Sequence, residues 1–94
     1  MGTPDKSLKG TGVATAQTAL NSSSAVAILT AKSRVFAEIK NVDASISIYV
    51  GDTGVTSSTG YLVKAGEAFQ LDNFVGVLYA IAASATPTVH TIQW

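Results

Sequence analysis

Apolar and polar residues alternate along several short stretches of this chain. In the clearest one, Val35, Ala37 and Ile39 fall on one side while Phe36, Glu38 and Lys40 fall on the other. Successive side chains of a β-strand point to opposite faces, so a period of two predicts a strand with one buried face. The pattern therefore predicts β-structure with one side turned toward a core.

Runs of this kind recur from Val13 to the end of the chain, separated by Gly, Asn, Asp, Ser and Pro. The predicted strands lie within residues 12–20, 25–30, 34–41, 45–51, 61–66, 67–71, 77–83 and 88–94. Seven or eight short strands with turn residues between them predict a β-sandwich or a jelly roll. We expect residues 77–83 to be buried on both faces, because that run is almost continuously apolar.

The main alternative concerns residues 25–41, whose Ala content would permit a helix. Frequent Val and Ile residues and the period of two favour strands there. Residues 1–12 show no hydrophobic period, so we expect an extended, flexible N-terminal arm followed by a single all-β domain over residues 13–94. A chain of 94 residues fits one domain.

Charged residues make up 13% of the chain, against about 25% in a typical globular protein. A surface poor in charge gives weak protection against association, which suits a protein packed against copies of itself or a partner. The formal net charge is zero, so the basic footprint of a nucleic-acid-binding protein is missing. No apolar run reaches the roughly 20 residues of a membrane helix, and we expect a protein that is soluble at least until it is assembled.

Residues for catalysis are scarce in this sequence. There is no cysteine, and His90 is the only histidine, within a predicted strand. Asp43, Asp52 and Asp72 fall in predicted turns, where Asp ordinarily bonds to nearby backbone. The Gly-rich loop over residues 51–60 lacks the Gly-Lys-Ser/Thr of a phosphate loop and has too few carboxylates for calcium. These features predict no enzyme activity, no cofactor and no metal site.

Several residues are candidates for contact with a partner. Three aromatic residues fall opposite the clear apolar stripes or at the chain end, where they could lie either at an interface or in a second core face. Two lysines belong to the predicted arm, and two polar residues begin the 51–60 loop. The candidate interface comprises Lys6, Lys9, Phe36, Tyr49, Asp52, Thr53 and Trp94.

Within residues 28–83 a set of short motifs can be compared with a known family. The motifs are Ala31 to Arg34, Asn41, Tyr49-Val50-Gly51, Val55-Thr56, Gly60, Gly66-Glu67 and Val77 to Ala83. In this order they resemble a family of small β-sandwich structural proteins of tailed bacteriophages. Leu62 takes the place of a family leucine, but it follows Gly60 by two residues where the family usually has three.

The resemblance implies a virion component without enzyme activity. We expect a capsid decoration protein, made in the host cytoplasm, that sits on the capsid surface and bridges subunits of the major capsid protein. The implied state is a homo-oligomer, with a trimer at threefold positions favoured, and neither nucleic acid nor membrane is expected as a partner. The alternative is a tail or fibre accessory module that binds a host-surface glycan through the 51–60 loop and exposed aromatic residues.

Overall fold

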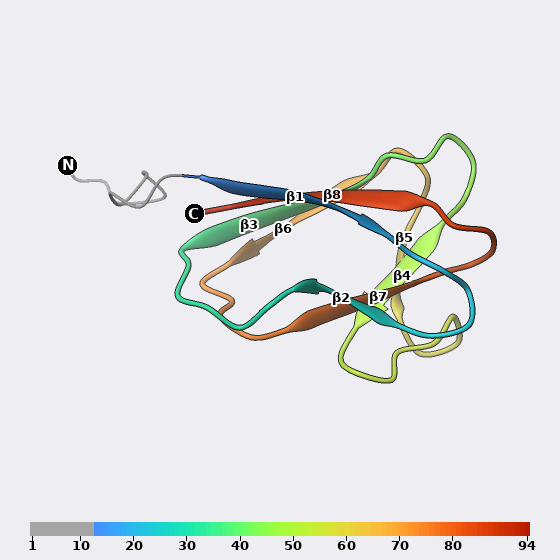
Figure 1. Cartoon of the computed structure of the whole chain (residues 1–94), viewed down its shortest axis with the longest axis horizontal. Helices are drawn as coiled ribbons and strands as arrows, with labels where there is room; N and C mark the ends of the chain where they lie inside the picture. Colours follow the sequence, from blue (N-terminus) through green and yellow to red (C-terminus); the bar gives the residue numbers. More distant parts are fainter. Residues whose placement is uncertain (1–12) are drawn as a thin grey trace.

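Eight β-strands form the regular structure of the chain in a computed structural model that describes residues 13–94 (Figure 1). The strands are β1 (Ala14–Ala19), β2 (Val26–Leu29), β3 (Phe36–Asn41), β4 (Ile48–Gly51), β5 (Tyr61–Val63), β6 (Ala68–Asp72), β7 (Leu78–Ala82) and β8 (Thr88–Gln93). The predicted arm over residues 1–12, with Lys6 and Lys9, lies outside the described residues. Residues 25–41 form β2 and β3, so strands are correct there and the helix alternative is wrong.

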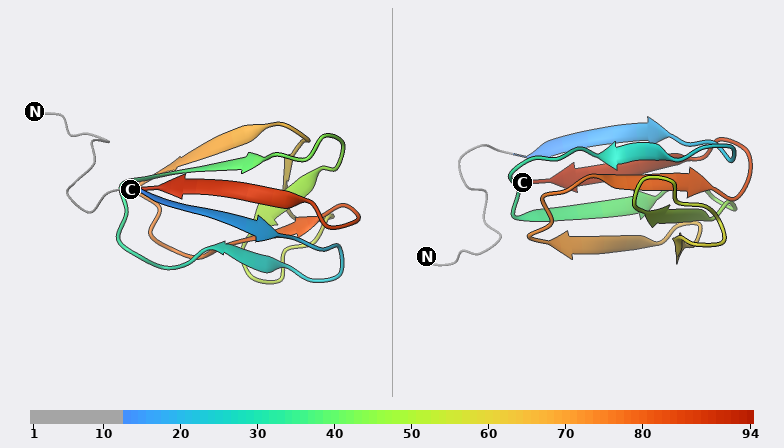
Figure 2. Two further views of the ribbon diagram at one scale, coloured as in Figure 1. Left: turned by 45° about the horizontal axis from the view of Figure 1, so that its top comes forward. Right: turned by 90° about the horizontal axis from the view of Figure 1, so that it is seen from below.

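The strands pair as they would in one long hairpin that has been rolled up. β1 pairs with β8, β2 with β7, β3 with β6 and β4 with β5, and every pair is antiparallel. Further pairing of β3 with β8 and of β4 with β7 completes two sheets. Sheet I has the order β1-β8-β3-β6 and sheet II the order β2-β7-β4-β5 (Figure 2). This is the jelly-roll arrangement, and the predicted all-β sandwich is confirmed.

The core lies between the two sheets, and the alternation read from the sequence sets which side chains enter it. Ala37 and Ile39 of β3 are fully buried, as is Ile48 of β4. Phe69 and Leu71 of β6 are partly buried and pack against this cluster. On β7, Ala80 and Ala82 face the core, while on the outer face Ile81 is 7% exposed and Tyr79 is half-buried, so the burial expected on both faces holds at Ile81 but not at Tyr79.

Turn geometry agrees with the sequence at one end of β6 and differs at the other. Gly66 has a φ of 80°, a left-handed conformation that glycine adopts without strain, and it lies in the turn between β5 and β6, where the sequence also separates two predicted strands. Asp72 is the last residue of β6 and is not in a turn, because β6 stays paired with β3 up to Phe36. The turn begins at Asn73, which has a φ of 58°.

Two buried polar side chains tie loops to the sheets. The Asn41 side-chain amide donates to the carbonyls of Ile46 and Val63, and so links the end of β3 in sheet I to β5 in sheet II. Arg34, which is only 6% exposed, donates to four acceptors in three separate segments. Within residues 13–94 there is no helix of any kind, and hence none long and apolar enough to cross a membrane.

Candidate partner-binding surface

The outer face of sheet II carries no charge. None of the residues in β2, β4, β5 and β7 is Lys, Arg, His, Asp or Glu, whereas the strands of sheet I contain Glu38, Lys40, Asp72 and His90. The four strands of sheet II are also rich in aromatic and aliphatic residues. The two faces of the sandwich therefore present different chemistry to the surroundings.

Tyr49 lies at the centre of this uncharged face. Its neighbours along β4, Ile48 and Val50, point into the core, so the Tyr49 side chain points outward. Directly opposite residues of an antiparallel pair share a face, and Tyr49 lies between Leu62 of β5 and Ile81 of β7. Leu62 is 40% exposed, so this row opens to solvent on the β5 side.

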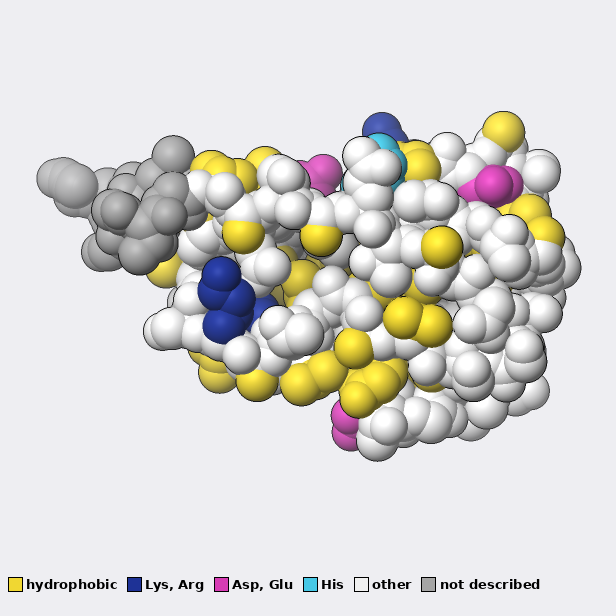
Figure 3. Space-filling view, in the orientation of Figure 1, with side chains coloured by type: hydrophobic (Ala, Val, Ile, Leu, Met, Phe, Trp, Pro, Cys, Tyr) yellow, Lys and Arg dark blue, Asp and Glu magenta, His cyan; other side chains and the backbone are white. Residues whose placement is uncertain are grey.

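The neighbouring rows extend the same apolar surface. Tyr79 of β7 points outward beside Ala27 of β2, and both are half-buried. Tyr61 of β5 does not belong to this surface, because it lies opposite the core residue Val50; it is 67% exposed, and its ring stacks edge-on against Phe69 of sheet I with 6.1 Å between centroids. We call Ala27, Tyr49, Leu62, Tyr79 and Ile81 the sheet II patch. Figure 3 shows hydrophobic side chains gathered along the lower border of the molecule, where Figure 1 places β2 and the start of β7.

Asp52 and Thr53 stand at the rim of this patch, because they follow β4 directly. Both are exposed, and the Asp52 carboxylate accepts the Thr53 backbone N–H at 2.8 Å. A shallow hollow of about 330 Å³ lies between Gly51, Asp52 and the segment 74–78. A second hollow of about 250 Å³ lies within the loop itself. The rim is therefore polar and open, while the patch beside it is apolar.

Phe36 and Trp94 form a separate aromatic pair on sheet I. Their ring centroids lie 4.9 Å apart at a tilt of 38°, and each backbone N–H donates to the other residue's carbonyl at 3.0 Å. Phe36 is 9% exposed, because Trp94 packs against it, and Trp94 itself is half-buried. This pair closes the end of sheet I where β3 begins and the chain ends.

The structure thus divides the predicted interface into two groups. Tyr49, Asp52 and Thr53 come together on sheet II, while Phe36 and Trp94 lie on sheet I. Leu62 and Tyr79 also belong to the sheet II surface, and neither was among the residues predicted from the sequence. A usable signal was present, because residues 45–51, 61–63 and 77–83 contain no charged residue at all.

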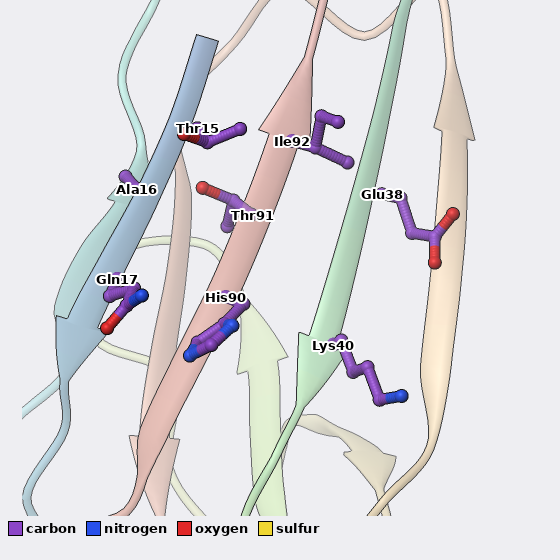
Figure 4. A pocket seen from close by; sticks show the side chains of 8 residues that line it. All are labelled: Thr15, Ala16, Gln17, Glu38, Lys40, His90, Thr91 and Ile92. Carbon is purple, nitrogen blue, oxygen red and sulfur yellow. The ribbon is translucent and has the colours of Figure 1, made fainter.

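His90 lies on the outer face of sheet I, in an open groove of about 480 Å³ (Figure 4). It sits between Gln17 of β1 and Lys40 of β3, and Glu38 lines the same groove one row away. The Glu38 carboxylate accepts a long hydrogen bond from Gln70 at 3.4 Å. Among residues 13–94, no three His, Cys, Asp or Glu side chains lie close enough together to hold a metal. The groove has the mixed polarity of a solvated sheet face.

The Asp43 carboxylate makes the turn bonds expected of it. Its Oδ2 accepts the backbone N–H groups of Ser45 at 2.9 Å and Ile46 at 2.8 Å. These two bonds, the Ser45 bond most strongly, hold the pKa of the Asp43 carboxyl below its usual value. The carboxylate is thus engaged in shaping the loop between β3 and β4.

Gly60 allows the 51–60 loop to pack against Tyr49. A Cβ at this position would lie 2.6 Å from the Tyr49 Cβ and 2.8 Å from a Val55 methyl carbon. We expect Gly60→Ala to lower the free energy of unfolding by about 1–3 kcal/mol in urea denaturation, as overpacking does elsewhere. Ser57→Ala, at an exposed position of the same loop, should stay within about 0.5 kcal/mol of the parent. Equal stability of the two variants would show that the loop does not rest on Tyr49.

Comparison of the chain with protein-family models, with curated proteins and with solved structures found no match. The bacteriophage resemblance therefore continues to rest on the sequence motifs within residues 28–83.

Proposed function

We propose that this chain is a non-enzymatic structural protein that decorates and stabilises a bacteriophage capsid, and that it docks on the shell through the sheet II patch. The observation that carries the proposal is an uncharged sheet face with an outward Tyr49 at its centre and a 40% exposed Leu62 beside it. The sequence motifs supply the bacteriophage context. The outer face of sheet II supplies a surface through which such a protein could dock on the shell.

The chemistry of the patch fits the centre of a protein–protein interface. Such centres are depleted in charged residues and enriched in Tyr, Trp and Phe, while their rims are polar. Tyr49 and Tyr79 lie within the uncharged face, and Asp52 and Thr53 stand at its edge. A standard interface buries about 1,600 Å² in total, which one face of a small sandwich can provide.

The jelly-roll arrangement alone does not choose between the two candidate functions. It occurs in viral capsid domains and in lectin domains alike, and fold by itself does not specify function. A glycan site would be expected to combine aromatic platforms with converging polar groups in a hollow. The hollows beside Asp52 are shallow and adjoin an uncharged apolar patch, which favours a protein partner.

Stabilisation in this proposal comes from buried area and not from chemistry. Each copy would bridge neighbouring subunits of the major capsid protein, with a trimer at threefold positions as the favoured arrangement. Contacts that exist only in the assembled shell stabilise that state by mass action. A shell under strain from packaged DNA fails first at its weakest subunit contacts, so bridging copies would matter most there.

The proposal predicts that particles lacking this protein assemble and adsorb to cells normally but release their DNA at lower temperature. Heating particles with and without the protein while following DNA release measures this directly. Normal heat resistance combined with lost adsorption would contradict decoration and support the glycan-binding alternative.

A binding experiment tests the docking face itself. Leu62→Glu places a charge in the sheet II patch and should weaken binding to undecorated particles about tenfold or more, as measured by co-sedimentation. Ala68→Glu, at an exposed position on sheet I, is the matched control and should bind like the parent. Equal binding of both variants would remove the sheet II patch from the proposal.

A further inference from the structure

The edges of the two sheets differ in how well they are protected. An edge strand exposes unpaired N–H and C=O groups, and proteins usually blunt it with charge, proline, a bulge or short length. The three-residue β5 is short and precedes Lys64, and β2 is broken by a register shift between Ala27 and Leu29. β6 carries Asp72 and follows Glu67. Three of the four edges thus have a recognisable device.

β1 has none of these devices. Its six residues, Ala14–Ala19, include no charge and no proline, and its register with β8 runs without interruption. β1 is the end strand of sheet I, and in the right-hand view of Figure 2 it lies outermost on its side of the molecule. Its outward side chains are small or neutral, namely Thr15, Gln17 and Ala19.

The hydrogen bonding of β1 shows which backbone groups remain for a partner. Leu20, one residue beyond the strand, donates its N–H to the Pro87 carbonyl at 2.9 Å. Backbone groups of an antiparallel strand alternate between its two sides, so Ala14, Ala16 and Thr18 bond to β8. The N–H and C=O groups of Thr15, Gln17 and Ala19 then point to the other side, where no described strand lies.

We propose that this edge is a self-association surface, where β1 pairs antiparallel with β1 of a second copy around a twofold axis. A head-to-tail ring needs two different complementary surfaces on each copy, and residues 13–94 offer only one unprotected edge. Pairing of β1 with β1 of a second copy is therefore the symmetric solution. This contact goes beyond the proposed docking face and does not depend on it. The trimer proposed above is an arrangement of copies on the shell, whereas the β1 pair forms between two free copies.

Symmetry and strand geometry fix the register of the pair. A twofold axis perpendicular to the sheet puts the outer faces of both copies on the same side of the joined sheet. Residues that point outward in one copy must therefore lie opposite residues that point outward in the other. Gln17 then lies opposite Gln17 of the second copy, and Thr15 lies opposite Ala19 of the second copy in both directions. All of these residues have free backbone groups, and together they supply about six intermolecular hydrogen bonds.

Charge does not oppose this arrangement. β1 is neutral, and Lys40 lies two strands in from the edge. Across the joined sheet the two Lys40 positions would be about 24 Å apart at the usual spacing of strands. This exceeds the Debye length of about 8 Å at physiological ionic strength, so their repulsion is screened. One strand pair is smaller than the roughly 1,000 Å² of a stable interface, so the dimer should be weak.

The test uses the isolated full-length protein in sedimentation equilibrium. We expect the average mass to rise from monomer toward dimer between about 10 μM and about 1 mM. Gln17→Lys and Gln17→Glu should each stay monomeric, because each places two like charges face to face on the axis. An equimolar mixture of the two variants should recover the dimer and exceed the parent in affinity, since opposite charges now meet.

Gln70→Lys, on the free side of β6, is the matched control and should associate like the parent. Thermal unfolding of all variants should coincide within a few degrees, which shows that loss of association is not loss of fold. A parent that stays monomeric throughout would overturn the proposal and leave the edge to a strand of another protein. Trimers, or a mixture of the two Gln17 variants that fails to associate, would overturn the twofold register.

Discussion

Asn41→Asp is expected to destabilise the protein by about 3–5 kcal/mol at neutral pH, although the two side chains have nearly the same shape. The Asn41 amide is fully buried, and its nitrogen donates to the Ile46 carbonyl at 2.8 Å and the Val63 carbonyl at 3.2 Å. A carboxylate has no hydrogen to give, so a buried negative charge would face two carbonyl oxygens.

The pH dependence of this variant provides a second readout. Burial beside carbonyls raises the pKa of the new carboxyl in the folded state above its unfolded value of about 3.9. The folded state then binds the proton more tightly than the unfolded state. The loss of stability relative to the parent is therefore small at a pH below the unfolded pKa and grows as the pH rises toward the folded pKa. Urea denaturation at acidic and neutral pH measures the difference.

Asn21→Asp is the control for this substitution. The Asn21 side chain acts through its oxygen, which accepts the backbone N–H groups of Ser23 at 2.9 Å and Ser24 at 2.8 Å. A carboxylate accepts these bonds equally well, so stability should stay within about 0.5 kcal/mol of the parent. If both variants lose the same stability, the Asn41 amide does not link the sheets as described.

The strands could be predicted from the sequence because alternation is a local signal. Whether a residue such as Ile39 or Ile48 points into the core can be inferred from the polarity of its immediate neighbours in the sequence. The pairing of strands is different, since β1 and β8 are separated by almost the whole chain and any strand with one apolar face could serve as a neighbour. The jelly-roll order and the open edge at β1 therefore emerge only from the structure.

The candidate surface was predictable in part for the same reason. Tyr49 stands out in the sequence because it is an aromatic residue opposite an apolar stripe. Leu62 could not be assigned to the same surface, because its position beside Tyr49 depends on the β4–β5 register. Phe36 and Trp94 share the sequence signal of Tyr49, yet they pack against each other on sheet I. An aromatic residue on the second face of a strand can thus cover a neighbour as well as meet a partner.

Arg34 is the clearest case of a role that the sequence does not reveal. It reads as an ordinary charge at the start of a strand, yet it is 6% exposed and its acceptors come from three segments. Its guanidinium donates to the Gln93 side-chain oxygen at 2.6 Å, the Phe74 carbonyl at 2.5 Å, and the carbonyls of Gly76 and Thr30. Backbone carbonyls carry no residue-specific signal, so the motif Ala31 to Arg34 does not reveal that this arginine ties three segments together.

Arg34→Met should lower the free energy of unfolding by about 3–5 kcal/mol, because it leaves these acceptors without a donor in a buried site. Burial lowers the pKa of the Arg34 guanidinium by desolvation, so the site disfavours the charge and the hydrogen bonds offset that cost. For a domain of this size the loss corresponds to a fall in melting temperature of more than about 10 °C. Circular dichroism during heating measures it.

Two further variants separate the role of Arg34 from a general effect of removing charge. Lys32→Met deletes a cation at an exposed position two residues earlier and should change the melting temperature by no more than a few degrees. Arg34→Lys keeps the charge but replaces the planar fork by a single ammonium, which cannot reach acceptors in three segments at once. It should therefore lose a large share of the stability that Arg34→Met loses. A lysine variant as stable as the parent would mean that charge alone, and not the geometry of the guanidinium, holds the loops around residues 30–34 and 73–77 to the end of β8.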